Sequence, residues 1–261
     1  MVSVPGQKSR SFWVGVALLV ALLLALSLMF GPLALATKNL VLAVAGTIRQ
    51  LPIYSVGTDE KKIAFSFDAT WGAERTPKIL DILDRYQIKT TFFLTNIWLK
   101  DYAPQAQEIA RRGHEIGMHS ATHPQFTSLS EAQMQKELQD NHDRILEVTG
   151  KKPKLFRPPF GDYNNQVIEV VKRMGFIPIQ WSIDSLDWRD LSGTEISQRV
   201  LRQAAPGAIV LFHNDGKYTP EALPVIIEQL KADGYQIVPI SELLLPGDYY
   251  VDVHGVQRPA R

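Results

Sequence analysis

The segment Ile63-Ala64-Phe65-Ser66-Phe67-Asp68 is the starting point for predicting the fold of this 261-residue chain. Its first five residues form a short, mostly apolar run that begins after two lysines and ends at a carboxylate. A run of this length is typical of a strand buried inside a parallel sheet. We therefore predict a central strand over 63–67 with Asp68 at its carboxyl end, where parallel β/α folds place their catalytic groups.

Short apolar segments alternate with amphipathic ones after this strand. Further strands are predicted over 90–94, 115–118, 155–156, 176–182, 208–212 and 236–240, and helices over 77–86, 104–112, 130–149, 165–174, 194–204 and 221–233. This alternation predicts an α/β fold with a parallel sheet. A regular eightfold barrel typically takes ~250 residues, so we expect an irregular (β/α)7–8 barrel instead. No Gly-rich phosphate loop follows the first strand, and we expect no nucleotide ligand.

The composition excludes several classes of function. Lys and Arg number 28 against 27 Asp and Glu, and this near-neutral balance argues against nucleic acid as the main partner. The chain has no cysteine, which excludes disulfides, thiolate metal sites and thiol nucleophiles. Any metal must therefore be held by histidine and carboxylate side chains.

The N-terminal segment predicts export. No charged residue occurs from Ser11 to Thr37, and the run Trp13–Phe30 is almost wholly apolar. About 20 such residues cross a bilayer as a helix. Lys8 and Arg10 precede the run, so we expect a single-pass anchor in the cell membrane with the rest of the chain extracytoplasmic. The alternative is a signal peptide cleaved after Ala36, which would give a secreted protein.

Four parts follow from these patterns. We expect a cytoplasmic tail and anchor over 1–37, a connector over 38–60, one catalytic-type domain over 61–245, and a polar surface tail over 246–261. The overall hydrophobic content of 45% is thus partly membrane segment and partly core.

Polar residues stand at the ends of successive predicted strands. They are Asp68, His119 and His123, Arg157, Asp184 with Asp187 and Trp188, and His213. The two histidines four residues apart can converge on one ion, either on a helix face or in a turn. Without cysteine, such a site suits zinc, cobalt or a similar divalent ion. Two exposed loop histidines are the alternative interpretation of this pair.

Taken together, these segments resemble the polysaccharide deacetylase family, which shares the NodB homology domain and is of the carbohydrate esterase family 4 type. The resemblance covers about residues 60–243 and rests on five ordered motifs. These are Ser66-Phe67-Asp68, His119 to His123, Arg157-Pro158-Pro159-Phe160, Asp184-Ser185-Leu186-Asp187-Trp188 and Leu211-Phe212-His213. The stretch Phe67 to Gly72 is most similar to the sporulation-type deacetylases of Gram-positive bacteria.

The resemblance implies a NodB-type barrel and metal-assisted removal of acetyl groups from N-acetylated sugars. It assigns the metal to His119 and His123, the general base to Asp68, and the orientation of that base to Arg157. General acid–base groups of this kind move the protons that amide hydrolysis requires.

It assigns the general acid to His213, held by Asp187, and an oxyanion contact to the backbone N–H of Phe160. Trp188 and Leu211 would form the apolar pocket for the acetyl methyl group. Ordinary core packing is the alternative role for these last two side chains.

One position departs from the family pattern. The second Asp of the first motif, which is the third metal ligand, is Ala69 here. Three arrangements stay open: Asp68 moves onto the metal, Glu74 reaches in as a ligand, or catalysis is lost while a sugar-binding cleft remains. Because every other motif residue is present, we favour retained but weak activity.

The leading hypothesis is therefore an N-deacetylase acting on a cell-wall polysaccharide, with peptidoglycan amino sugars as the expected substrate. A catalytically degenerate wall-binding or sporulation protein is the alternative that Ala69 suggests. An O-acetyl esterase or small-amide hydrolase on the same barrel is a third.

Overall fold

The structure is a computed structural model that describes residues 49–260. Residues from Gln50 onward form one compact unit. The predicted membrane anchor over 1–37 lies outside the described residues, as do residues 38–48 of the predicted connector. Over residues 49–260, no helix is both long and apolar enough to cross a membrane.

A curled, wholly parallel sheet organises this unit, and strand β2 (Lys62–Ala69) lies inside it. The hydrogen-bonded order is β6-β5-β4-β3-β2-β8-β7, and β9 pairs with the first residues of β2. The remaining bounds are β3 (Thr91–Leu94), β4 (Glu115–Met118), β5 (Leu155–Phe156), β6 (Ile177–Pro178), β7 (Ile183–Asp184), β8 (Ile209–His213) and β9 (Gln236–Val238). The prediction of an α/β fold with a parallel sheet is confirmed.

Stacked aromatic rings hold the central strands together. Phe67 of β2 stacks on Phe92 of β3 and on Phe212 of β8, with ring centroids 4.9 and 5.4 Å apart. All three side chains are fully buried, and rings of this size dominate the energetics of a core. The same pairing sets Asp68 beside His213 in the strand register, so two polar groups meet at one edge of the sheet.

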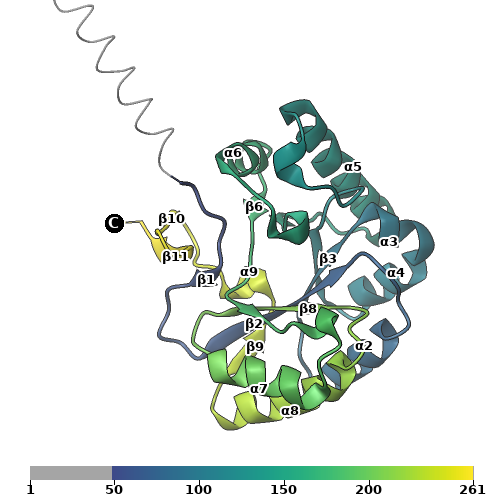
Figure 1. Ribbon diagram of the computed structural model, residues 1–261, viewed down its shortest axis with the longest axis vertical. Coiled ribbons are helices and arrows are strands. Elements are labelled where there is room, and N and C mark those ends of the chain that lie inside the picture. Colours follow the sequence, from purple (N-terminus) through teal and green to yellow (C-terminus); the bar gives the residue numbers. More distant parts are fainter. Residues whose placement is uncertain (1–48, 261) are drawn as a thin grey trace, which may run out of the picture. The chain divides into compact units, whose positions relative to one another are not determined.

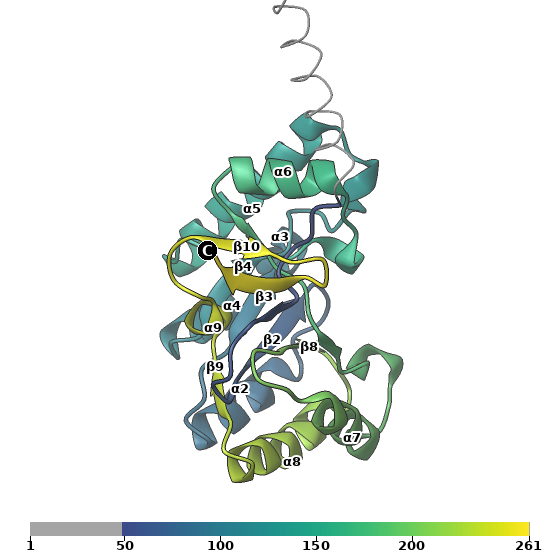
Figure 2. The same cartoon turned by 90° about the vertical axis from the view of Figure 1, so that its left-hand side faces the viewer.

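Helices pack around the outside of the sheet (Figures 1 and 2). They are α2 (Thr76–Arg85), α3 (Asn96–Asp101), α4 (Ala103–Arg111), α5 (Glu131–Thr149), α6 (Asn165–Arg173), α7 (Gly193–Gln203) and α8 (Thr219–Ala232). The short helix α9 (Ile240–Leu243) instead packs on the other face of the sheet, against Ala64 and Phe93. Helix α5 begins where the sequence predicts, because Ser130 and Gln133 form a reciprocal capping box. The short helix α3 was not predicted, and the N-cap hydroxyl of Thr95 starts it.

The sheet is an open half-barrel, which corrects two predictions. The single strand predicted over 176–182 is replaced by β6 near its start and by β7 just after its end, and these lie on opposite edges, since β6 pairs with β5 and β7 pairs with β8. Between them the chain crosses the opening, where Ile179 bridges to Ile53. An apolar run predicts a buried strand but not its neighbours, so the sequence could not show that the two edge strands stay unpaired with each other.

The ends of the unit also differ from prediction. Part of the predicted connector forms β1 (Ser55–Val56), and the predicted polar tail forms β10 (Tyr249–Val251) and β11 (Val256–Pro259). These strands pair in the order β1-β11-β10 and lie on the side of the main sheet away from α3 and α4 (Figure 1). Gln257 is buried there, although it is polar. The domain boundaries expected at 60 and 245 therefore cut through packed structure.

Candidate active site

The carboxyl ends of the parallel strands surround a cavity of about 640 Å³. Its lining includes Asp68, Thr70, Trp71, His119, His123, Phe160, Trp181, Asp184, Asp187, Trp188, Asp190, Leu211, His213, Asp215, Gly216 and Lys217. All the predicted site residues except Arg157 line this cavity, and Arg157 lies fully buried behind Asp68. The structure thus brings the predicted residues together, because parallel strands deliver their carboxyl ends to one edge.

A buried ion pair fixes the candidate base. Arg157 Nη1 donates to Asp68 Oδ1 at 2.7 Å, while Nη2 donates to Ser66 Oγ at 2.8 Å. The guanidinium also lies over the Phe93 ring, 4.2 Å from its centroid. Burial opposes the ionisation of Asp68, but the charge of Arg157 and its hydrogen bond help to hold the pKa of the carboxyl below its usual value. Asp68 is therefore an ionised, oriented carboxylate.

The two predicted metal ligands are neutral imidazoles. His119 Nδ1 lies 2.8 Å from the Arg157 carbonyl oxygen, so Nδ1 carries the proton and Nε2 keeps its lone pair. The His119 and His123 rings are 5.0 Å apart. Burial lowers the pKa of His119, and it lowers the pKa of His123 to about 4. Both rings therefore present lone pairs at neutral pH, which metal binding requires.

This donor set fits a divalent ion, with one ligand missing. His119 Nε2 faces Asp68 Oδ2 at 3.4 Å, and a divalent cation bound to both atoms would be stabilised by their lone pairs. Two imidazoles and a carboxylate oxygen suit zinc. Yet no group of three or more ligands converges anywhere in residues 49–260. Asp68 is bonded to Arg157, and Ala69 packs into the core.

Glu74 does not fill the gap. Its side chain is exposed and does not line the cavity. The alternative in which Glu74 replaces the missing ligand is therefore not seen in this structure. Arg157 holds Oδ1 of Asp68, so in the alternative in which Asp68 moves onto the metal it would bind through Oδ2, the same oxygen that a general base would use.

The candidate acid lies across the strand register from the base. His213 Nδ1 donates to Asp187 Oδ1 at 2.8 Å, and the backbone N–H of His213 donates to Asp187 Oδ2 at 2.8 Å. The hydroxyl of Thr219 donates to the same Oδ2 at 2.6 Å. Burial alone would lower the pKa of His213, but the bond to Asp187 and its charge raise it to about 9. His213 is consequently a protonated imidazolium at neutral pH.

The three predicted substrate contacts all line the cavity, with different exposures. Leu211 is 3% exposed, whereas Trp188 is 57% and Phe160 is 67% exposed. Trp188 is therefore not a core residue, and the alternative role of core packing does not apply to it. Phe160 has a φ of 59° inside the short turn Pro159–Gly161, a conformation unusual for a bulky residue and concentrated at functional sites.

Sequence reasoning missed two side chains of this site. Thr219 begins α8, and its bond to Asp187 joins residues far apart in the chain. Trp71 lies three residues after Asp68 and packs edge-on against the His123 ring, with centroids 6.2 Å apart. The available indication for Trp71 was its place in the stretch Phe67 to Gly72, which carries the subgroup resemblance without a site role for the tryptophan. No local pattern marks Thr219.

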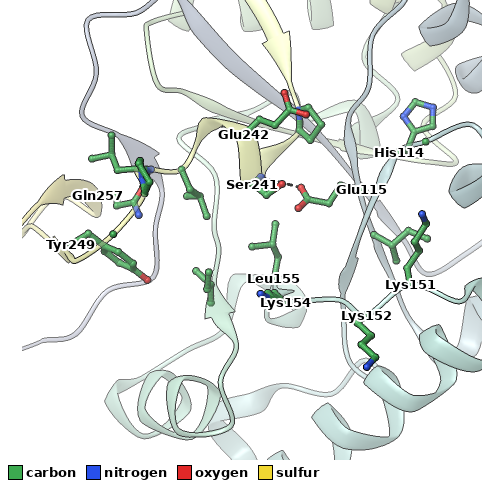
Figure 3. A pocket seen from close by; sticks show the side chains of 18 residues that line it. His114, Glu115, Lys151, Lys152, Lys154, Leu155, Ser241, Glu242, Tyr249 and Gln257 are labelled. Atoms are coloured by element: carbon green, nitrogen blue, oxygen red, sulfur yellow. Dashed lines mark hydrogen bonds between the residues drawn. The ribbon is translucent and has the colours of Figure 1, made fainter.

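A second cavity, of about 660 Å³, lies at the opposite end of the sheet, beside the first residues of β4 and β5 (Figure 3). Lysines such as Lys151 and Lys152 line it, and Glu115 accepts a hydrogen bond from the Ser241 N–H. None of the predicted site residues reaches it. The chemistry belongs to the cavity at the carboxyl ends.

A curled parallel sheet with a candidate base, a candidate acid and two imidazoles at its carboxyl edge is the arrangement that the five motifs predict for the polysaccharide deacetylase class. The chain belongs to the polysaccharide deacetylase family, whose sequence profile matches residues 55–179. It is 34% identical over 195 residues to the peptidoglycan-N-acetylmuramic acid deacetylase PdaA of Bacillus subtilis, a match covering 73% of this chain and 74% of PdaA.

Two further relatives bear on whether a protein of this family is catalytically active. The uncharacterized protein YlxY of Bacillus subtilis is 34% identical over 193 residues, covering 74% of this chain and 60% of YlxY. The solved structure of BA3943, described as a CE4 family pseudoenzyme from Bacillus anthracis, is 35% identical with a TM-score of 0.72, covering 75% of this chain and 69% of that one. A BA3943 mutant described as having restored enzymatic activity matches equally well, at 36% identity and a TM-score of 0.72.

Proposed function

We propose that this protein is a metal-dependent hydrolase that removes N-acetyl groups from a cell-wall polysaccharide, with peptidoglycan amino sugars as substrate. One observation carries the proposal: an ionised carboxylate and a protonated imidazole, each fixed by a buried partner, stand side by side in one cavity with two neutral histidines. The similarity to PdaA supports the choice of peptidoglycan.

His119 and His123 would hold the divalent ion, which supplies Lewis-acid polarisation when bound. Asp68 takes a proton from the attacking water as general base, since its carboxylate is ionised and lines the cavity. Arg157 keeps Asp68 charged and fixes its orientation through Oδ1, leaving Oδ2 for this proton. The water oxygen bonds to the acetyl carbonyl carbon.

His213 completes the reaction by protonating the leaving amine as the C–N bond breaks, so that acetate and a free amino sugar result. Asp187 keeps this imidazole charged until the transfer. The backbone N–H of Phe160 is proposed to stabilise the developing oxyanion. Leu211 and Trp188 line the cavity and are proposed to contact the acetyl methyl group.

A second candidate function follows from Ala69. A site with two histidines binds metal more weakly than one with three protein ligands, and the BA3943 relative is described as a pseudoenzyme. The protein would then be a degenerate glycan-binding or sporulation protein. The cleft residues other than the missing carboxylate would serve recognition in that case.

Acetate release tests the first candidate. The full chain, with Zn²⁺ or Co²⁺ added, is incubated with acetylated chito-oligomers and with muropeptides, and acetate is measured. We expect turnover that is abolished by His119→Ala and retained in His142→Ala, a histidine outside the cavity. No acetate from any substrate with any divalent ion would refute the enzyme, and an O-acetylated glycan in parallel separates an esterase from an amidase.

We further propose a single-pass membrane location with the domain extracytoplasmic, supported by the apolar run Trp13–Phe30 and the preceding Lys8 and Arg10. Protease added to intact protoplasts should then degrade the domain. Recovery of the protein only in the culture supernatant would indicate cleavage after Ala36 instead.

A further inference from the structure

Asn141 is a buried polar residue on the apolar face of α5. The other residues that this helix buries are Met134, Leu138 and Ile145, at the three- and four-residue spacing of a helix face. Packing alone would favour an apolar side chain at position 141, because burying an amide costs free energy unless its hydrogen bonds are made. Asn141 is fully buried and lies outside the five motifs. Its amide therefore has to find its partners inside the protein.

This amide joins the carboxyl ends of β3 and β4. Asn141 Oδ1 accepts a hydrogen bond from the His119 N–H at 3.0 Å, and Nδ2 donates to the Leu94 carbonyl oxygen at 3.0 Å. The His119 N–H is shared with that same carbonyl oxygen, 3.1 Å away. Leu94 is the last residue of β3, and His119 follows the last residue of β4. A side chain from α5 thus ties the first candidate metal ligand to the neighbouring strand.

The same amide also reaches the segment between the two histidines, which we call the histidine loop (residues 119–123). Asn141 Nδ2 donates to Asn96 Oδ1 at 2.8 Å, and the Asn96 N–H donates to the Ser120 carbonyl oxygen at 3.3 Å. The Ser120 hydroxyl in turn accepts the His123 N–H at 2.9 Å. Asn96 begins α3, which packs against α5 (Figure 1). The network therefore connects one side chain of α5 to both ends of the histidine loop.

The histidine loop needs such support because its backbone is strained. Ser120 has a φ of 74° and His123 a φ of 57°, in the left-handed region that residues other than glycine seldom adopt. Conformations of this kind persist only where the surrounding contacts hold them. In this conformation the rings of His119 and His123 lie 5.0 Å apart. Release of the loop would therefore separate the two candidate ligands.

Asparagine suits position 141 because the network uses every polar atom of the amide. One acceptor serves His119, and the two Nδ2 hydrogens serve Leu94 and Asn96. Leucine has a similar shape but no polar atom, and aspartate has no N–H to donate. A side chain needed only for packing would not require this combination.

We propose that Asn141 is a positioning residue for the candidate metal site, which holds the histidine loop so that His119 and His123 are placed for one divalent ion before that ion binds. The idea rests on the proposed function in assigning a metal to these histidines. Because Ala69 offers no third ligand, affinity depends on two imidazoles, and a loss of preorganisation reduces it directly.

Zinc affinity tests the proposal, measured on the full chain by competition with a chelating dye. We expect Asn141→Leu to bind zinc about 10–100-fold more weakly than wild type, which is the usual effect of losing a group that orients a metal ligand. Ile145→Ala is the matched control, because it opens a cavity on the same buried face of α5, one helical turn beyond Asn141. This variant should lose stability and keep the zinc affinity of the wild type.

A second variant cuts only one link of the network. Asn96→Ala removes the acceptor that joins Asn141 to the histidine loop, at a half-buried position where substitution is better tolerated. Its zinc affinity should lie between those of the wild type and Asn141→Leu. Wild-type zinc affinity in either asparagine variant, or an equal loss in Ile145→Ala, would overturn the proposal.

Backbone hydrogen exchange in EDTA gives a readout that needs no metal. The amides of the histidine loop should exchange at least tenfold faster in Asn141→Leu than in wild type, measured relative to the amides of β2 in the same protein, so that a general loss of stability does not count. Ile145→Ala should show no such relative change. A histidine loop that stays as protected in Asn141→Leu as in wild type contradicts the positioning role.

Acetate release is scored separately, so that failure of the hydrolase and failure of the positioning role can be told apart. A protein that binds zinc with the expected dependence on Asn141 but releases no acetate rejects the hydrolase and keeps the positioning role. A protein that releases acetate and binds zinc equally well as wild type and as Asn141→Leu rejects only the positioning role.

Discussion

The active-site cavity has an acid half, formed by His213, Asp187 and Thr219, and a metal half, formed by His119, His123 and Asp68. The two halves differ in how many of their polar side-chain atoms have a hydrogen-bond partner. In the acid half, Asp187 accepts three hydrogen bonds, two from His213 and one from Thr219. In the metal half, the ring nitrogens of His123 make no hydrogen bond within residues 49–260, and His119 Nε2 faces a carboxylate oxygen. The acid half is complete by itself, whereas the metal half presents lone pairs to a partner that the chain does not supply.

The family's missing carboxylate at Ala69 therefore affects the metal half of the cavity and leaves the acid half intact. A buried ion pair is weak evidence for stability, because well-packed apolar residues of similar volume often serve as well. A chain with no use for proton transfer has no stability reason to keep the buried Asp68–Arg157 pair beside the half-buried His213–Asp187 pair. Their joint presence supports a function for both pairs, and it confines the defect to one ligand.

The largest expected effect is on turnover, and it comes from removing the charge of Asp187 in the acid half. Asp187→Asn removes the charge that holds His213 protonated, and loss of general acid catalysis lowers turnover by about 10²–10⁴-fold. Acetate-release kinetics measure this. An equal rate in the variant would show that the two halves do not differ in function.

The same variant has a defined pH signature. The wild-type pKa of His213 is raised from 6.5 to about 9, so the acid stays loaded and activity falls only as the pH passes about 9. In Asp187→Asn, burial of the imidazole acts without its counter-charge, and the basic limb moves toward lower pH. The stability that this pair contributes is likewise present below pH 6.5 and lost as the pH rises through about 9.

A second prediction concerns the buried pair that supports the base. Arg157→Met leaves Asp68 as an uncompensated buried charge and lowers the free energy of unfolding by about 3–5 kcal/mol. Urea denaturation measures the change. The double variant Arg157→Met with Asp68→Asn should recover part of the loss, because the orphaned charge is then gone. No recovery would mean that packing against Phe93, not charge, dominates at Arg157.

The third prediction repairs the incomplete half. Ala69→Asp supplies the missing carboxylate and should raise zinc affinity by about 10–100-fold, measured by competition with a chelating dye. Without metal, the new carboxylate is buried and unpaired, so the variant should be less stable than wild type by about 1–3 kcal/mol and regain stability with zinc. Unchanged zinc affinity would show that position 69 does not face the ion.

The sequence predicted the parts of this molecule that depend on short-range pattern. The strand over 115–118 has the bounds of β4, and the Ser130 cap begins α5. Parallel topology then brought residues as distant as Asp68, His119 and His213 to one cavity, because each stands at the end of a strand. Whether the barrel closes, and whether residues 249–259 form strands, depends on which strands pair with each other. No local sequence pattern encodes that pairing.

The smallest expected effect probes the one bond of the acid half that sequence reasoning missed. Thr219→Val removes the hydroxyl that donates to Asp187 Oδ2 and should lower the free energy of unfolding by about 1–3 kcal/mol. Asp187 keeps both bonds from His213, so the imidazole stays protonated and turnover falls far less than in Asp187→Asn. Thr122→Val, which removes an exposed bond to Glu137, is the matched control and should change stability by no more than about 0.5 kcal/mol. If both threonine variants lose equal stability, Asp187 does not need its third donor, and the contrast between the two halves reduces to the ligand missing at Ala69.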